Sequence, residues 1–351
     1  MKRTIFVSLL ACVLISALGA QTLDKPAATV RLIRTESIPL SKLQKTVSTL
    51  EAQTKQTLTA DQRKSVLDSM VGNALVLQAA ERDKVVVSDA EMKTVLANYE
   101  LQYGMAAGLG RAMTDTELQN YWKNAGSSYA DFQKLVRDQQ TLIDYIKLKR
   151  KAMFDAIKPV SDSDVQDYYD AHKASFFYDD MVYIRHIFID THQLTKQDDK
   201  DRAGKRAADI LKELKAGATF DALVIKYSED TKSKYNTGNL GWLQRNDTNN
   251  LQIFGQGFFD AVFKLKKGDT SGVIQSNVGY HIVQVTDRFD AKLLTLDDKV
   301  PPVNDSTLRE SIRKLILNKT QNDVLNSAMA DLVTELKKTA EIKIFTENLS
   351  W

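Results

Sequence analysis

The chain has 351 residues, of which 43% are hydrophobic and 26% are charged, and its formal net charge is +3. This length exceeds what one hydrophobic core usually organises, so we expect two or more domains. The 48 basic and 45 acidic residues are interleaved along the chain, which excludes the basic stripe that phosphate-backbone binding requires. We therefore expect no nucleic-acid partner.

The first 20 residues have the pattern of a secretory signal peptide. Two basic residues precede an apolar run from Ile5 to Leu18, and small residues end the segment. We expect cleavage after Gly19 or Ala20 and an exported mature protein. A membrane anchor is the alternative, but the run is shorter than about 20 residues and no basic stop-transfer residues follow it.

Cys12 is the only cysteine and lies inside this segment. The mature chain therefore has no disulfide and no Cys-based metal site or nucleophile. Residues 9–12 match a bacterial lipobox loosely, but cleavage there would leave an apolar run at the new N-terminus. We favour a periplasmic location over an extracellular, lipid-attached one.

Residues 21 to about 180 are expected to be mainly helical. Residues 28–33 alternate weakly and could form a strand ahead of the helices. Capping boxes then open amphipathic stretches at Thr59–Gln62, Ser88–Glu91 and Thr114–Glu117. After the second box, apolar residues recur at helical spacing and are expected to be core: Met92, Val95, Leu96 and Tyr99.

Between about Val182 and Arg288 the composition changes, because glycine becomes more frequent, β-branched strands appear and the helices shorten. This pattern predicts a separate domain with the element order βααβαββ. The expected strands are Tyr183–Ile189, Asn239–Leu243, Val273–Gln275 and Tyr280–Thr286, and the expected helices are Asp201–Lys215, Phe220–Tyr227 and Phe258–Phe263.

After Pro302 the sequence predicts one long helix, Asp305 to about Lys338, and a strand-like tail, Ile342–Phe345. A lone amphipathic helix cannot bury its own apolar stripe, so we expect it to pack on the N-terminal helices. The middle domain would then be an insertion in a discontinuous helical domain. The expected apolar face consists of Leu308, Ile312, Leu315 and Ile316.

Several stretches of the middle segment together resemble a parvulin rotamase domain over essentially its full length. They occur in the family's order and spacing as YIRHIFI, RAGKRAADILKELKAGATFDALVIKYSED, GNLGWL, FFDAVFKLKKGDTSGV and VGYHIVQVTDR. With the signal segment and the flanking helices, the chain is similar to the SurA and PrsA group of extracytoplasmic foldases.

The resemblance implies an α+β protein with a signal peptide at residues 1–20 and a helical chaperone domain built from residues 21–180 and 289–351. A parvulin domain with a four-stranded antiparallel sheet and helices would occupy residues 181–288. The implied activity is peptidyl-prolyl cis/trans isomerisation, in which an amide with a rotational barrier of about 20 kcal/mol is turned without making or breaking a bond. No cofactor and no metal are implied. The partners would be unfolded or nascent exported polypeptides that contain X–Pro bonds.

The resemblance also assigns three catalytic residues. His186 and His281 would face each other at the base of the site, and alternation places both on the face that carries apolar neighbours in their strands. Asp230 would act electrostatically, because a carboxylate beside the amide disfavours the planar, carbonyl-polarised form. We expect burial to raise the pKa of Asp230.

The proline ring is expected to bind in an apolar pocket formed by Leu240 and Phe258, with Phe254 as a third wall. Two features depart from the family pattern. Val278 stands where many parvulins have a hydroxyl residue before Gly-x-His, and residues 244–257 form a longer connection than usual. Both departures could reduce the catalytic rate.

Other classes of function are less well supported. The four histidines show no zinc-ligand spacing, and no nucleophile-elbow sequence for a Ser/His/Asp hydrolase is present. The alternative that remains is a non-catalytic holdase chaperone, with a degenerate parvulin domain used for client binding and an apolar cradle in the helical domain. Exchange of helical segments would also permit a homodimer.

Overall fold

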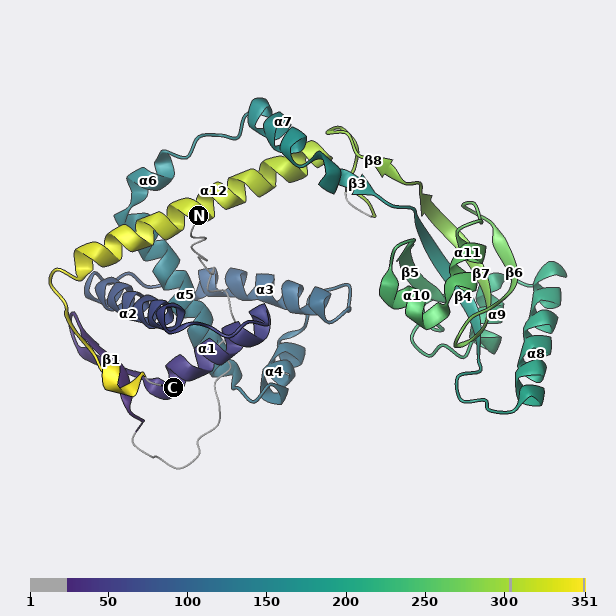
Figure 1. Cartoon of the computed structure of the whole chain (residues 1–351), viewed down its shortest axis with the longest axis horizontal. Helices are drawn as coiled ribbons and strands as arrows, with labels where there is room; N and C mark the ends of the chain where they lie inside the picture. Colours follow the sequence, from purple (N-terminus) through teal and green to yellow (C-terminus); the bar gives the residue numbers. More distant parts are fainter. Residues whose placement is uncertain (1–23, 303–304, 350) are drawn as a thin grey trace. The chain divides into compact units, whose positions relative to one another are not determined.

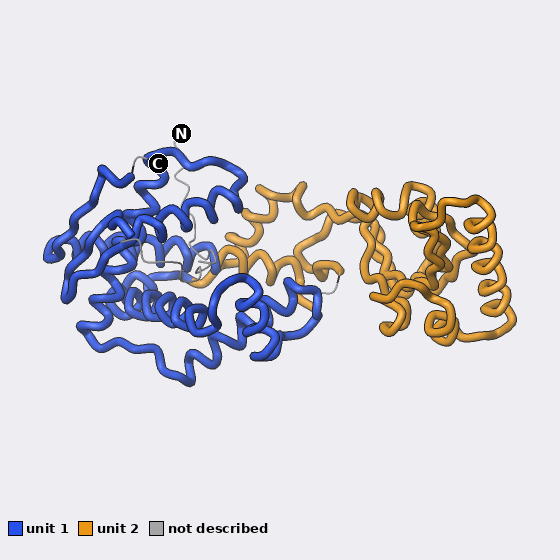
Figure 2. The backbone as a smooth tube through the Cα atoms, turned by 90° about the horizontal axis from the view of Figure 1, so that it is seen from below, with its two compact units in different colours: residues 1–158, 318–351 blue, residues 159–317 orange. Residues whose placement is uncertain are grey.

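The computed structural model describes residues 24–302, 305–349 and 351, so the predicted signal segment lies outside the described residues. The chain forms two compact units (Figures 1 and 2). The first joins residues 1–158 to residues 318–351 and is therefore discontinuous in sequence. The second, residues 159–317, extends beyond the expected parvulin range of 181–288 at both ends.

The first unit begins with a hairpin of β1 (Pro26–Arg31) and β2 (Thr35–Pro39). The C-terminal β9 (Glu341–Ile344) pairs antiparallel with β1 and completes a three-stranded sheet in the order β2-β1-β9. The weak alternation near residue 28 and the strand-like tail near residue 342 thus correspond to two strands, whose pairing with each other was not predicted. A short 3-10 turn, η2 (Thr346–Asn348), follows β9.

Six helices follow the hairpin: α1 (Leu40–Thr54), α2 (Ala60–Arg82), α3 (Asp89–Ala106), α4 (Asp115–Asn124), α5 (Tyr129–Lys149) and α6 (Lys151–Asp155). The caps explain where three of them begin. Thr59 and Thr114 form complete capping boxes at α2 and α4, whereas Ser88 at α3 accepts from the Glu91 N–H and makes half of the box. No helix in the described ranges is both long and apolar enough to cross a membrane.

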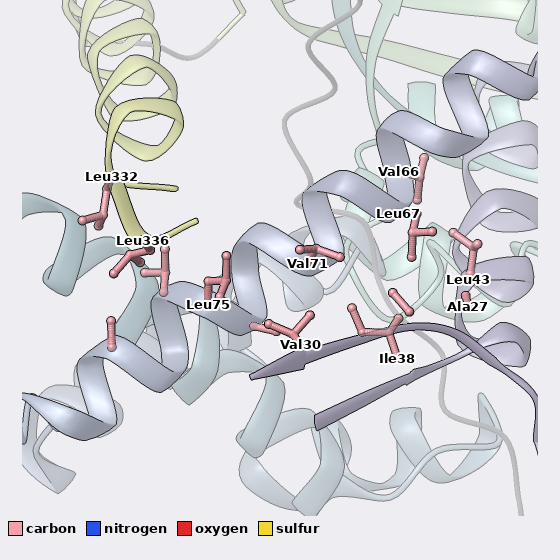
Figure 3. Close-up of a cluster of buried hydrophobic side chains, with 14 of the residues drawn as sticks. Ala27, Val30, Ile38, Leu43, Val66, Leu67, Val71, Leu75, Leu332 and Leu336 are labelled. Atoms are coloured by element: carbon pink, nitrogen blue, oxygen red, sulfur yellow. The ribbon is translucent and has the colours of Figure 1, made fainter. Parts of the chain in front are cut away.

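The main core of this unit lies between α2 and the small sheet (Figure 3). Val30 and Ile38 of the hairpin and Leu75 of α2 are buried in one apolar cluster. Leu332 and Leu336 of the C-terminal helix belong to the same cluster. Burying a leucine fully is worth about 1.5–3 kcal/mol, so these side chains hold the C-terminal segment in the unit.

A second, smaller core joins α3, α4 and α5. Met92 is buried in it, and Val95, Leu96 and Tyr99 pack against it, as their helical spacing predicted. Trp122 of α4 stacks on Phe132 of α5 with ring centroids 4.7 Å apart. The apolar face of α3 is therefore core.

Gln78 on α2 is a fully buried polar residue that binds the turn of the β1–β2 hairpin. Its side-chain oxygen lies 3.0 Å from the Leu32 N–H and 3.2 Å from the Ile33 N–H, and Arg34 donates a third, longer bond. Its amide nitrogen donates to Glu36. One side chain thus satisfies the backbone donors of the whole turn.

Replacing Gln78 with alanine is expected to lower the free energy of unfolding of the first unit by about 2 kcal/mol, because three backbone N–H groups of the turn lose their shared acceptor. Thermal or urea unfolding checks this. The matched control is Gln53→Ala on α1, where the glutamine is exposed. Equal stability of the two variants would contradict the proposed role of Gln78.

The C-terminal helix, α12 (Leu308–Leu336), contributes to both units. Its last turns enter the main core, as expected, but Leu308 and Ile312 pack instead with α7 (Asp162–Ala171) and with Leu294. The expectation that Leu315 lies on the buried face was wrong, because 49% of it is exposed. A short ribbon of β3 (Phe177–Tyr178) and β8 (Lys292–Leu293) and the turn η1 (Lys173–Phe176) complete this part of the second unit.

The sheet of the expected rotamase domain has four antiparallel strands, as predicted. Their order in the sheet is β5-β4-β7-β6. The strands are β4 (Met181–Asp190), β5 (Asn239–Gln244), β6 (Thr270–Gln275) and β7 (Gly279–Phe289). The helices are α8 (Gln197–Lys215), α9 (Phe220–Tyr227), α10 (Thr248–Phe254) and α11 (Gln256–Val262). Helix α10 was not predicted and lies in the connection that the sequence showed to be long.

The two faces of this sheet have separate cores. Ile187 and Ile282 face α8 and α9, while Ile184 and Val283 share a cluster with Phe258 of α11. Because side chains alternate along a strand, the even-numbered residues of β4 and the odd-numbered residues of β7 lie on the α11 face. Both predicted histidines are therefore on that face.

Candidate active site

His186 and His281 are buried on neighbouring central strands. In the antiparallel pairing of β4 with β7, His281 lies opposite Phe188, two residues beyond His186 on the same face. The Nδ1 atoms of the two histidines are 3.1 Å apart, and their side chains are almost inaccessible to solvent. The sequence-predicted pair is thus in direct hydrogen-bonding contact.

Asp230 lies in the turn after α9, and its carboxylate faces the Nε2 atom of the His186 ring. Its Oδ2 atom is 3.1 Å from His186 Nε2 and also accepts a 2.5 Å hydrogen bond from the hydroxyl of Ser233. Its Oδ1 atom accepts from the backbone N–H of Lys232. The carboxylate is therefore held at both oxygens.

Ser276 supplies the hydroxyl that the sequence seemed to lack at position 278. Its Oγ lies 2.8 Å from His281 Nε2 and accepts from the N–H groups of Val278 and Gly279. Val278 therefore does not leave His281 without a hydroxyl partner. A continuous chain of hydrogen bonds runs from Ser276 through both histidines to Asp230.

The expected direction of the Asp230 pKa shift was wrong. The hydrogen bond from His186 lowers the pKa of this carboxyl well below its usual range, and the bonds from Ser233 and the Lys232 backbone add to it, while burial opposes them. Asp230 is therefore ionised at neutral pH. Burial, together with the neighbouring His186, lowers the pKa of His281 well below 6.5, so His281 is neutral.

The hydrogen-bonding partners determine which ring nitrogens of the two histidines carry protons. Because Asp230 is ionised, His186 Nε2 must carry a proton toward it. When His186 is neutral, its Nδ1 is then an acceptor, so His281 Nδ1–H is the donor between the rings. His281 Nε2 in turn accepts from the Ser276 hydroxyl.

The apolar residues expected to hold the proline ring are not equally accessible. Phe254 is half-buried and stacks on Phe258 with centroids 4.7 Å apart, and both rings contact His281 edge-on. Phe258 is fully buried, so Phe254 and Leu240 are the two of the three that present surface to a ligand. Leu240 packs against the same cluster as Phe258.

Three residues next to the histidines were not predicted as site residues: Phe188, Ser233 and Ser276. Phe188 is half-buried and stacks on His186 at 5.6 Å between centroids and tilts against His281 at 4.8 Å. Its place in the alternation with His186 was the available signal. The two serines had none beyond their short spacing from Asp230 and His281.

The arrangement does not suit covalent catalysis. Ser233 Oγ lies 3.3 Å from His186 Nε2, the same nitrogen that faces Asp230, and its hydroxyl donates to the carboxylate. A Ser/His/Asp triad instead needs the serine and the aspartate on opposite nitrogens of the ring. Within the described residues no three His, Cys, Asp or Glu side chains cluster as metal ligands.

Comparison with known protein families matches two parts of the chain. Residues 171–289 match the model of the PPIC-type PPIase domain, which contains the histidine pair and Asp230. Residues 2–145 match the model of the SurA-like N-terminal domain. The two matches do not overlap and follow each other along the chain.

Individual proteins are similar to parts of the chain. The foldase PrsA of Caldanaerobacter subterraneus subsp. tengcongensis is 26% identical over 287 residues, which cover 82% of this chain and 72% of that protein. The chaperone SurA of Methylococcus capsulatus is 28% identical over 223 residues, or 63% of this chain and 45% of that protein. A Geobacillus PrsA is 31% identical over 186 residues, or 51% of this chain and 56% of that protein. The chain thus spans about half the length of the second and third of these relatives.

The α+β fold, the antiparallel rotamase sheet and the two family matches agree with one another. The chain therefore contains a PPIC-type PPIase domain that follows a SurA-like N-terminal domain, and it is similar to the PrsA foldases and SurA chaperones.

Proposed function

We propose that this chain is an exported peptidyl-prolyl cis/trans isomerase and chaperone that assists the folding of other exported polypeptides. One observation carries the proposal. It is the buried chain of hydrogen bonds that joins Asp230, His186 and His281 beside the half-exposed Phe254, inside a PPIC-type domain. Its substrates would be X–Pro bonds in unfolded client segments.

Asp230 supplies the electrostatic part of the catalysis. In the planar amide, resonance places negative charge on the carbonyl oxygen, and in the twisted amide much of that charge returns to nitrogen. A fixed carboxylate near the oxygen therefore destabilises the planar form more than the twisted one, which lowers the barrier. The depressed pKa keeps Asp230 charged for this role at neutral pH.

The histidine pair holds that charge in place, and the apolar residues hold the ring. His186 donates to Asp230 while His281, neutral and buried, fixes the orientation of His186. Phe254 and Leu240 offer apolar surface for the proline ring. None of these steps needs a proton to leave the chain of hydrogen bonds.

Protease-free isomerisation kinetics on Ala-x-Pro-Phe-type peptides test the proposal, with the chain lacking residues 1–20 compared with His186→Ala. We expect acceleration by the parent chain and a large reduction in the variant, with unchanged circular dichroism. A parent chain that leaves the peptide rate unchanged but suppresses aggregation of an unfolded client would favour the non-catalytic holdase.

A chaperone activity has an observation of its own. Leu101 and Met105, one turn apart on α3, are 49% and 57% exposed, and Leu109 just beyond the helix is 43% exposed. Tyr121 of α4 is exposed too, and its ring is 4.9 Å from that of Tyr103 on α3. Exposed apolar groups of this kind bind unfolded segments.

The double variant Leu101→Ser/Met105→Ser is expected to suppress client aggregation several-fold less well than the parent, with unchanged peptide isomerisation. Light scattering of a diluted, denatured client measures this. The matched control is Leu148→Ser on α5, a leucine that is 59% exposed in the same unit. If that control lost as much chaperone activity as the double variant, the α3 surface would not be the holding site.

We also place the chain in the periplasm, supported by the signal-like opening and by the poor lipobox at Cys12. Osmotic-shock release tests this, and retention in a lipid-modified membrane fraction would contradict it. A homodimer through the helical domain remains compatible with the two-segment first unit. Sedimentation equilibrium at micromolar concentration distinguishes monomer from dimer.

A further inference from the structure

Ser233 occupies an unusual place beside the predicted catalytic residues. It is 3% exposed and lies in the turn between α9 and β5. Its hydroxyl is within hydrogen-bonding distance of both Asp230 Oδ2, at 2.5 Å, and His186 Nε2, at 3.3 Å. A single buried hydroxyl therefore touches two members of the site.

The backbone fixes Ser233 relative to the sheet. Its carbonyl accepts from the N–H groups of Asn236 and Gly238, and the Gly238 carbonyl accepts from the His186 N–H at 2.8 Å. Gly238 has φ +78°, and a Cβ there would lie 2.4 Å from the His186 carbonyl oxygen, so glycine is needed for this approach. The turn that carries Ser233 is thus bound to β4 at His186 itself.

The Ser233 hydroxyl also makes the two carboxylate oxygens of Asp230 accept different numbers of hydrogen bonds. Oδ2 receives both Ser233 and His186, whereas Oδ1 receives only the Lys232 N–H. A carboxylate oxygen accepts two or more hydrogen bonds, so Oδ1 retains capacity that Oδ2 has used. Without Ser233, the Asp230 carboxylate would lose the shortest of the three contacts that restrain its rotation and would keep only those with His186 and the Lys232 N–H.

From this geometry we propose that Ser233 is a positioning residue that fixes the Asp230 carboxylate against His186 and thereby directs Asp230 Oδ1 toward the bound amide. The proposal rests on the isomerase function proposed above and deepens it. Ser233 touches no reacting atom. It acts through Asp230. In the described part of the chain, the hydrogen-bonding partners of this carboxylate are His186 from β4 and Ser233 and Lys232 from its own turn.

The test compares Ser233→Ala and Ser233→Thr in the chain lacking residues 1–20. A hydrogen bond to a charged group is worth about a tenfold change, so we expect Ser233→Ala to lower kcat about tenfold with KM little changed, and Ser233→Thr, which keeps the hydroxyl, to restore most of it. Two-dimensional NMR exchange measurements at several peptide concentrations give kcat and KM separately. If Ser233→Ala fails to fold, Ser233→Cys replaces it as a nearly isosteric side chain with a weaker donor.

A second readout does not depend on activity. In ¹⁵N-labelled protein the His186 Nε2–H proton, held against Asp230, is expected downfield, and Ser233→Ala should shift it or expose it to exchange with water. The matched control is Ser228→Ala. Ser228 is equally buried, and its hydroxyl accepts from the Phe188 N–H without contacting Asp230 or His186.

The outcomes separate the two proposals. A changed His186 signal with a lower kcat in Ser233→Ala, and neither in Ser228→Ala, supports the positioning role. An unchanged His186 signal, or effects equal to those of Ser228→Ala, overturns it. If the parent chain has no isomerase activity, the isomerase proposal fails and the His186 signal alone still decides whether Ser233 positions Asp230.

Discussion

Replacing Asp230 with asparagine is expected to lower kcat/KM for X–Pro isomerisation by on the order of 100-fold while the rotamase sheet stays folded. Asparagine has the same shape, and its carbonyl oxygen still accepts from Ser233 or His186, so the packing of the turn is preserved. Only the negative charge is removed. Since the proposed catalysis depends on that charge near the amide oxygen, most of the acceleration should disappear.

Peptide isomerisation by NMR exchange measures the effect, and Glu229→Gln is the matched control. Glu229 is the next residue in sequence and pairs with Arg206, so its substitution removes one negative charge close by without touching the histidines. We expect Glu229→Gln to change kcat/KM less than twofold. Equal losses in the two variants would mean that net charge near the site matters, and that Asp230 has no specific role.

The histidine pair illustrates what the sequence could predict. Alternation placed His186 and His281 on the apolar faces of two strands, and the resemblance to parvulins made those strands neighbours. Antiparallel pairing then leaves little freedom, because diagonal neighbours on one face of a strand pair are about 7–8 Å apart, which is within reach of ring side chains. The pairing of β4 with β7 brings the two rings into contact for that reason.

The serines and the pKa of Asp230 could not be predicted in the same way. Ser233 and Ser276 reach the site from turns, whose conformations depend on backbone hydrogen bonds that no periodicity reports. The sign of the Asp230 shift depends on a balance between burial and donated hydrogen bonds. Burial was foreseeable, but the donors became visible only when the turn was folded.

Helix α12 shows a different limit. Its apolar stripe was expected to pack on the N-terminal helices, but the helix packs against two different parts of the chain, and Leu315 is 49% exposed. Leu308 and Ile312 pack near α7, and Leu332 and Leu336 pack near α2. A pattern of apolar residues shows that a helix face is buried and carries no information on which surface covers it.

Acidification is expected to destabilise the rotamase domain as the pH falls below about 6.5. The cause is His281, whose pKa is lowered well below 6.5 in the folded chain by burial and then by His186. In the unfolded chain this histidine binds a proton near pH 6.5, whereas the folded form does not. The stabilising effect is therefore complete above pH 6.5 and is lost as the pH falls toward the folded pKa, by at most about 1.4 kcal/mol per pH unit.

Asp230 does not contribute to this window. Its folded pKa is also lowered, so its stabilising effect is complete above the unfolded value near 3.9 and is lost only at lower pH. The groups that contact His281 from the surrounding elements are His186, Ser276, Phe188, Phe254 and Phe258, of which only His186 is titratable. A change in stability between pH 6.5 and 4.5 therefore reports on His281.

Urea unfolding between pH 7.5 and 4.5 measures this dependence. In a background with Trp122→Phe and Trp351→Phe, Trp242 becomes the sole tryptophan, and it lies on β5 of the rotamase sheet in edge contact with Tyr183. His281→Asn removes the titrating ring but keeps a donor toward His186 Nδ1, so we expect a lower but flatter stability profile.

The control is His192→Asn, which alters an exposed histidine of the same domain and leaves the buried pair intact. It should retain the full loss of stability on acidification. If His281→Asn instead kept the same slope as the parent chain, His281 would not be the group that takes up the proton on unfolding. The folded state would then have to contain a protonated His281, which donates from both ring nitrogens: from Nδ1 to His186, as before, and from Nε2 to Ser276. In that case Ser276 would accept from His281, and the Asp230 carboxylate would have to supply the compensating negative charge.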